Sequence, residues 1–172
     1  MGIRNVLIEG GSGTGKTTVA TELERRGYHV VHGDRVLAYQ GDPVTGARLL
    51  PAVAAFHADD PYFISQHHIW DVEKVKALVA DHTFPVTFFC GGSRNVACFI
   101  DLFDAVFVLD IVIETLNHRL DGRRDEWGSK PAERALILRQ HMSRKDLPPN
   151  AISIDATRSV VDVVDDILAR CG

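Results

Sequence analysis

Short apolar runs alternate with longer amphipathic stretches along the chain, and the two kinds of segment predict different elements. Five runs are bounded by glycine, proline or polar residues, and they cover residues 3–9, 28–32, 85–90, 105–110 and 151–154. Runs of this length are typical of strands that are buried on both faces of a parallel sheet. The stretches with helical character cover residues 16–26, 71–82, 95–103, 112–120, 131–143 and 160–170. The alternation predicts an α/β fold, with a five-stranded parallel sheet covered by helices on both faces.

The segment from Asp34 to about His68 shows no single period. Its glycines and prolines interrupt regular elements, and they are Gly41, Pro43, Gly46, Pro51 and Pro61. We therefore expect two or three short helices joined by turns here. The chain shows no internal repeat, so we expect one domain over residues 1–172. Ligands of parallel sheets bind beyond the carboxyl ends of the strands, so the residues after each strand are the first candidates for chemistry.

The first expected strand is followed by a loop that fits a phosphate-binding pattern. The sequence GGSGTGKT at residues 10–17 matches G-x-x-x-x-G-K-[ST] at every fixed position. Glycines let such a loop curl so that its N–H groups point at phosphate oxygens, and the following helix adds its N-terminal dipole. We expect Lys16 to reach the β- and γ-phosphates of ATP and the Thr17 hydroxyl to bind Mg²⁺. The expected nucleotide-binding residues are Gly10, Gly11, Ser12, Gly13, Thr14, Gly15, Lys16, Thr17 and Thr18.

Asp34 follows the second expected strand and is the next candidate. Its carboxylate would lie across the cleft from the phosphate loop, where it can accept a proton from an attacking hydroxyl or hold Mg²⁺. The alternative is that Asp34 only caps the helix that follows. Many phosphate-loop proteins place a magnesium-binding Asp at the end of the third strand, where this chain has Cys90. Asp34 is therefore the better metal candidate, and Asp110, at the end of the fourth strand, is the weaker rival.

Two further groups of residues follow the third and fourth expected strands. Gly91, Gly92 and Arg94 can bind an anionic or polar group of an acceptor substrate, or they form a plain turn with a surface arginine. Three arginines then lie within six residues, namely Arg119, Arg123 and Arg124. Phosphoryl transfer spreads negative charge that mobile arginines can neutralise, and closure of their loop excludes water. We expect all three to be catalytic. The alternative is a solvated loop with arginines paired to the adjacent acidic residues.

The composition and charge of the chain exclude some classes of binding partner. The 172 residues suit one domain, and 19 Lys and Arg against 23 Asp and Glu give a net charge of −4. That balance argues against binding to nucleic acid or an anionic membrane, and no apolar run reaches the ~18 residues that cross a bilayer. The three cysteines form no CxxC pair, so we expect neither a disulfide framework nor a zinc cluster. We expect a cytoplasmic enzyme, monomeric or homodimeric.

The phosphate loop, His32-Gly33-Asp34 and the arginine-rich segment 119–128 together resemble small phosphate-loop kinases of the adenylate, shikimate and gluconate kinase group. The resemblance covers most of the chain. It implies a core sheet of strand order 2-3-1-4-5, with ATP and Mg²⁺ as cofactors. It further implies an acceptor-binding segment at about residues 34–68 and a lid at about residues 121–131. The loop after the last strand, at residues 154–157, resembles the one that lines the adenine in this group.

The chain departs from the group on the acceptor side. Nucleoside monophosphate kinases hold the acceptor phosphate with an Arg where this chain has Leu37. The acceptor segment contains only Arg35 and Arg48, whereas an acceptor phosphate normally needs an arginine clamp. We therefore expect transfer of the γ-phosphoryl group of ATP to a small hydroxyl-bearing acceptor, such as a nucleoside, sugar acid or polyol. The alternatives are a nucleoside monophosphate kinase and a non-kinase phosphate-loop ATPase or nucleotide switch.

Overall fold

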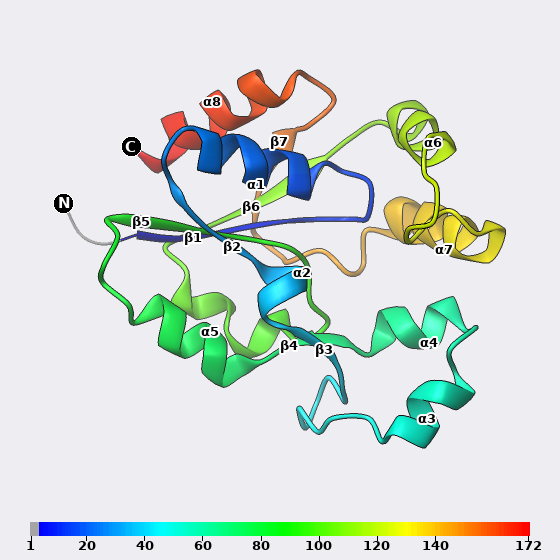
Figure 1. Ribbon diagram of the computed structural model, residues 1–172. Coiled ribbons are helices and arrows are strands. Elements are labelled where there is room, and N and C mark those ends of the chain that lie inside the picture. The colour runs from blue at the N-terminus through cyan, green and yellow to red at the C-terminus, as the bar shows by residue number, and fades with distance from the viewer. Residues whose placement is uncertain (1–3) are drawn as a thin grey trace.

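A five-stranded parallel sheet forms the central layer of the computed structural model, which describes residues 4–172 (Figure 1). Its neighbouring strands all pair in parallel, in the order β2-β5-β1-β6-β7. The strands are β1 (Arg4–Gly10), β2 (His29–His32), β5 (Val86–Cys90), β6 (Ala105–Asp110) and β7 (Ile152–Asp155). The predicted α/β class with five parallel strands is confirmed. Ile3, the first residue of the first predicted strand, lies outside the described residues.

Two short strands were not predicted, and they change the numbering of the sheet. β3 (Ala38–Gln40) and β4 (His68–Trp70) pair antiparallel in a separate two-stranded sheet. The order β2-β5-β1-β6-β7 therefore differs from the expected 2-3-1-4-5. The expected order numbers only the strands of the core sheet, whereas the observed numbering also includes β3 and β4. Each extra strand has three residues, too few for an alternating pattern to stand out in a segment rich in glycine and proline.

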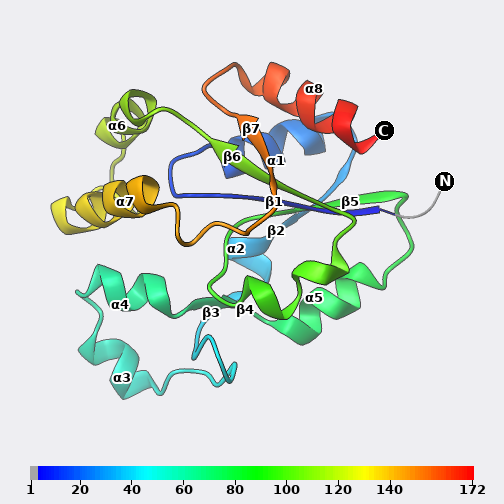
Figure 2. The ribbon, with the colours of Figure 1, turned by 180° about the vertical axis from the view of Figure 1, so that it is seen from behind.

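Helices cover both faces of the sheet (Figures 1 and 2). α1 (Lys16–Arg25) and α8 (Val160–Cys171) lie on one face, and α5 (Val72–Val79) lies on the other. Two 3₁₀ helices, η1 (Val96–Cys98) and η2 (Ile100–Leu102), follow β5, and Phe99 between them shares a core cluster with Val75 of α5. The single short helix predicted over residues 95–103 is therefore present as two separate 3₁₀ turns. Phe99 has a φ of −143° and separates the two turns, with its side chain buried in the core.

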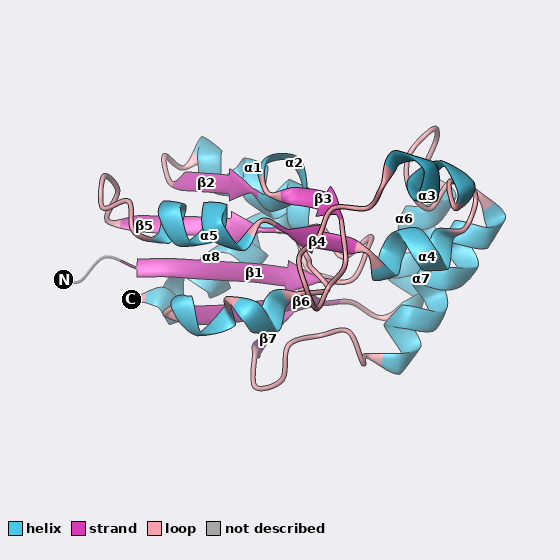
Figure 3. Cartoon of the chain, turned by 90° about the horizontal axis from the view of Figure 1, so that it is seen from below, coloured by secondary structure: helices cyan, strands magenta, loops and turns pink. Residues whose placement is uncertain are grey.

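The remaining helices stand beyond the carboxyl ends of the strands, toward which the arrowheads in Figure 3 point. Proline begins three of them, at the first helical position, where its missing N–H costs no hydrogen bond. They are α2 (Gly33–Val36), α3 (Pro51–Phe56), α4 (Pro61–Gln66), α6 (Ile113–Asp121) and α7 (Pro131–Ser143). Within residues 4–172, no helix is long and apolar enough to cross a membrane.

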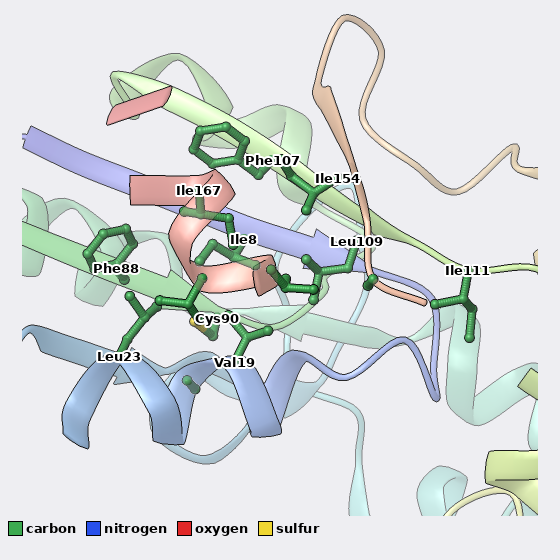
Figure 4. Packing of buried hydrophobic residues seen from close by; sticks show 14 of the residues in the cluster. Ile8, Val19, Leu23, Phe88, Cys90, Phe107, Leu109, Ile111, Ile154 and Ile167 are labelled. Atoms are coloured by element: carbon green, nitrogen blue, oxygen red, sulfur yellow. The ribbon is translucent and has the colours of Figure 1, made fainter. Parts of the chain in front are cut away.

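Two apolar cores, one on each face, hold the sheet between its helices. Successive strand residues point to opposite faces, so Ile8 belongs to one core and Leu7 to the other. Figure 4 shows Ile8 and Phe88 of the sheet packed near Leu23 of α1 and Ile167 of α8, and all four are fully buried. Full burial of side chains of this size contributes about 1.5–3 kcal/mol each. The cores therefore give the strand ends a rigid support.

Candidate active site

The phosphate loop connects β1 to α1 and needs its glycines for its conformation. Gly10, Gly13 and Gly15 have φ angles of 155°, 85° and 101°, a region that other residues rarely adopt. A Cβ atom at Gly13 would lie 2.7 Å from Leu116. Gly15 is the N-cap of α1, so the first N–H groups of that helix face the loop. The local geometry is that of an anion-binding site.

Lys16 folds back over this loop. Its Nζ donates hydrogen bonds to the carbonyl oxygens of Gly10 at 2.7 Å and Gly11 at 2.9 Å. Burial lowers the pKa of Lys16, while the negative charge of Asp34 acts in the opposite direction. The ammonium group is thus held at the loop by neutral acceptors, which phosphate oxygens can replace.

Two cavities meet at the phosphate loop. The α1 cavity, of about 870 Å³, extends from residues 12–19 to α6 and to the loop before α8. The α7 cavity, of about 460 Å³, extends from the other side of the loop to α4 and α7. Four residues line both cavities, and they are Ser12, Thr14, Lys16 and Asp34. A group bound on the loop would therefore be accessible from both sides.

Asp34 lies on α2 as a half-exposed carboxylate between the cavities. Its Oδ1 accepts hydrogen bonds from Nε2 of His68 at 3.1 Å and from the Gly92 N–H at 3.4 Å. Burial acts to raise the pKa of Asp34, but the bond from His68 and the charge of Lys16 outweigh it and hold the pKa below its ordinary value. The N-cap of α2 is His32, so Asp34 is not the cap of that helix. His68 was not predicted as a site residue.

Trp70 of β4 fixes the position of Asp34 from beneath the site. Its side chain is buried, stacks on Phe99 at 5.6 Å between ring centroids, and lines neither cavity. A Cβ atom would lie 2.0 Å from the Trp70 ring at Gly33 and 2.6 Å from it at Gly91. Glycine at these two positions therefore lets the ring pack under the ends of β2 and β5, which places Asp34 beside the loop after β5.

Glu9 is a candidate that the sequence analysis missed. It precedes the phosphate loop directly, is 4% exposed, and lines the α7 cavity. Its Oε2 atom has no hydrogen-bond partner among residues 4–172. Burial raises the pKa of Glu9 to about 8, although the charges of Lys16 and Arg94 act to lower it. The signal in the sequence was an acidic residue directly after the apolar residues Val6, Leu7 and Ile8.

The loop after β5 contributes Gly92 and Arg94 to the α7 cavity, whereas Gly91 packs beneath it. Arg94 connects two elements on either side of the cavity. Its Nε and Nη2 donate to the carbonyl and hydroxyl oxygens of Ser65 at 2.9 and 2.6 Å, and its Nη1 lies 2.7 Å from Asp146. This arginine therefore orders α4 and the segment after α7.

α7 and the segment that follows it form a wall of the cavity that was not predicted. Arg144 donates a hydrogen bond from Nη1 to Oδ2 of Asp110 at 2.8 Å. Asp110 thus pairs with an arginine. The wall residues are Ile137, Gln140, His141, Arg144, Asp146 and Leu147. These residues are far from the phosphate loop in sequence, and no local sequence pattern indicates that they line a cavity beside it.

The three predicted arginines separate into two groups. Arg119 donates to the carbonyl oxygens of Gly13 at 3.1 Å and Ala156 at 3.0 Å, and lines the α1 cavity. Arg123 lines the same cavity and donates to Ser12 Oγ at 3.2 Å. Arg124 lines neither cavity and donates to backbone carbonyls of its own turn. Within residues 4–172, no ion pair joins Arg123 or Arg124 to the acidic residues that follow them.

The donor set of the α1 cavity fits a magnesium ion. The Thr17 hydroxyl and the Asp34 carboxylate both line it, and both are oxygen ligands of the kind that Mg²⁺ prefers. Within residues 4–172, no three His, Cys, Asp or Glu side chains are grouped to hold a metal. Such an ion would therefore take its other ligands from phosphate oxygens and water, as Mg²⁺ commonly does at nucleotide sites.

The fold matches those of solved kinases, although no protein-family model and no curated protein matches the sequence. A sugar kinase from a Janibacter species is 19% identical, with a TM-score of 0.57 over 97% of this chain and 93% of that chain. Deoxyadenosine kinase from M. mycoides with bound dATP is 17% identical, with a TM-score of 0.55 over 97% and 98%. Shikimate kinase from Bacteroides thetaiotaomicron is 11% identical, with a TM-score of 0.58 over 98% of both chains. The chain therefore shares the fold of these kinases.

Proposed function

We propose that the protein is a kinase that transfers the γ-phosphoryl group of ATP to a hydroxyl group of a small acceptor. The observation that carries the proposal is that Lys16 and Asp34 line both cavities. ATP would occupy the α1 cavity and the acceptor the α7 cavity, with the phosphate loop between them. The solved structures with this fold include kinases named for a sugar, for shikimate and for deoxyadenosine, which supports the same class of reaction.

On the nucleotide side, residues 10–18 bind the phosphates through their N–H groups and Lys16. The Lys16 ammonium exchanges its two carbonyl acceptors for phosphate oxygens, which keeps its charge satisfied during binding. Arg119 and Arg123 already contact atoms of the loop, so they stabilise the charge that develops on the transferred group. Arg124 takes part only if residues 121–131 close over the loop as a lid. Thr17 and Asp34 would hold Mg²⁺, which when bound would further neutralise phosphate charge.

On the acceptor side, Asp34 receives the proton of the attacking hydroxyl. Its lowered pKa means that it is ionised at neutral pH, as a proton acceptor must be. Residues 34–68, Gly92 and Arg94 hold the acceptor in the α7 cavity, whose volume of about 460 Å³ suits a small molecule. Glu9 is protonated at neutral pH, because its pKa is about 8, and it can donate a hydrogen bond into this cavity.

The test is ATP turnover with and without acceptors. ATP consumption by the protein alone should be slow, and one member of a panel of nucleosides, sugar acids and polyols should raise it at least 10-fold, with a phosphorylated acceptor as product. Hydrolysis that no acceptor changes would instead support an ATPase or a switch. Phosphorylation of a nucleoside monophosphate with kcat/KM above ~10⁴ M⁻¹s⁻¹ would support a monophosphate kinase.

A further inference from the structure

Both arginines of the α7 cavity are paired with carboxylates. Nη1 of Arg94 lies 2.7 Å from Asp146, and Nη1 of Arg144 lies 2.8 Å from Asp110. The other donors of Arg94 include Nε and Nη2, which Ser65 occupies. The side chain of Arg94 is 18% exposed, so this pair is shielded from water more than an ordinary surface pair. The positive charge of each arginine is therefore already balanced by a carboxylate, and Nε, Nη1 and Nη2 of Arg94 each have a partner.

The remaining charges of the cavity do not favour an anion either. Three cationic side chains line it, Lys16, Arg94 and Arg144, against the four carboxyl groups of Glu9, Asp34, Asp110 and Asp146. Lys16 is committed to the phosphate loop, which leaves Asp34 as the charge nearest an acceptor hydroxyl. An acceptor that carries a carboxylate or phosphate would thus meet two arginines whose charge is balanced and the negative carboxylate of Asp34, whereas an uncharged acceptor meets no repulsion.

The same cavity offers one apolar side. Ile64 of α4 and Ile137 of α7 line it together with Trp127 and Leu147. α4 and α7 face each other beyond the strand ends (Figures 1 and 3), and Ile64 and Ile137 line the cavity from these two helices. Apolar walls with a few placed polar groups are typical of sites for ring-bearing small molecules. The polar end, with Glu9 and Asp34, is the end next to the phosphate loop.

We propose that Asp110 and Asp146 determine specificity by neutralising the two cavity arginines, so that the acceptor is an uncharged hydroxylated compound with an apolar or aromatic ring, as in a nucleoside. This inference rests on the kinase function proposed above. It distinguishes between the acceptor classes, because a sugar acid or a monophosphate would need one of these arginines to bind its negative charge. Asp146 should matter more than Asp110, since Arg144 is half exposed and water screens its pair.

The test compares acceptors that differ in charge. Wild type should phosphorylate an uncharged acceptor, from nucleosides or sorbitol, with kcat/KM at least 10-fold above that for gluconate or any nucleoside monophosphate. Asp146→Asn should lower the KM for gluconate at least 10-fold, because Arg94 is freed, and should reduce the ratio of kcat/KM for the uncharged acceptor to kcat/KM for gluconate by at least the same factor. Asp110→Asn should act in the same direction with a smaller change.

Asp165→Asn is the matched control, because Asp165 pairs with Arg26, which is 20% exposed, and neither residue lines a cavity. It should change neither KM. A wild type that prefers gluconate or a monophosphate, or an Asp146→Asn variant that loses affinity for gluconate, would overturn the inference. Calorimetric binding of gluconate to protein saturated with a non-hydrolysable ATP analogue tests the same gain without turnover. If no acceptor is phosphorylated, the kinase proposal fails, while this binding measurement still decides the role of Asp146.

Discussion

The two cavities that meet at the phosphate loop use their arginines in opposite ways. In the α1 cavity, Arg119 and Arg123 donate to backbone carbonyls and a hydroxyl group, so their positive charge stays available. In the α7 cavity, Arg94 and Arg144 each face a carboxylate. Arginine side chains therefore offer positive charge for phosphate oxygens in one cavity, whereas in the other they connect the wall elements through ion pairs. The number of arginines near a site says little about its charge until their partners are known.

The cavities also differ in how the chain builds them. In the proposed kinase, residues 10–18 would supply most of the phosphate contacts from one continuous loop. The α7 cavity is assembled from Glu9, α2, α4, the loop after β5 and α7, which are far apart in sequence. A substitution on the nucleotide side should therefore remove chemistry directly. A substitution on the acceptor side should act through charge and hydrogen bonding.

The largest effect should come from the centre of the nucleotide side. Lys16→Ala removes the ammonium group that both cavities share, and we expect turnover to fall about 10³-fold, or about 4 kcal/mol. Steady-state kinetics with saturating ATP and acceptor measure the loss. Lys76→Ala, in an exposed pair on α5, is the matched control and should be fully active. Full activity of a folded Lys16→Ala protein would exclude the loop as the phosphate site.

The buried acid of the acceptor side should appear in the pH dependence of stability. Below about pH 4.5, Glu9 is protonated in both the folded and the unfolded chain. As pH rises, the unfolded chain releases this proton first, because burial raises the folded-state pKa to about 8, so the contribution of Glu9 to folded stability is lost progressively up to that pH. Relative to wild type, Glu9→Gln should therefore gain about 3 kcal/mol in unfolding free energy between pH 5 and pH 8.

Urea unfolding at several pH values measures that difference. Glu73→Gln removes an acid that is 80% exposed, and its stability should stay parallel to that of wild type across the same range. Parallel curves for Glu9→Gln and wild type would mean that Glu9 titrates like an exposed glutamate in the folded protein. The acceptor cavity would then carry an additional negative charge at neutral pH.

Asp34→Asn tests the carboxylate that lines both cavities, because the substitution removes the charge of the side chain and keeps its shape. The amide cannot accept a proton, so we expect kcat to fall about 10²-fold, or about 2.7 kcal/mol, while the Kd for ATP changes less than threefold. Turnover is measured at saturating Mg²⁺, and ATP binding by calorimetry. Normal turnover would leave Asp34 with a structural role only. Asp59→Asn, in the same segment but outside both cavities, serves as the control.

The smallest expected difference lies between two neighbouring arginines. Arg123→Ala should lower kcat about 10-fold because its guanidinium contacts the phosphate loop, whereas Arg124→Ala should lower it less than threefold. Parallel kcat and KM measurements on the two variants distinguish catalysis from binding. Equal losses would show that residues 121–131 close during turnover and bring Arg124 to the phosphates, as the sequence predicts.

The sequence predicted what depends on local spacing and missed what depends on topology. The phosphate loop could be identified because its glycines and Lys16 have fixed separations, and the parallel sheet because each strand is one apolar run. Glu9 and Asp146 could not, since burial and a partner from another element decide their chemistry. The two 3₁₀ turns replaced a predicted helix because packing of Phe99 against the core outweighed the helical spacing around it.

The two tryptophans of the chain occupy contrasting environments, and this makes the acceptor cavity visible to fluorescence. Trp70 is buried and lines neither cavity, so its emission should stay constant during binding. Trp127 lines the α7 cavity, where a ligand that displaces water changes the polarity around the indole. In a Trp70→Phe background, the emission of a single native side chain would report occupancy of the acceptor cavity, and no dye or label would have to be attached.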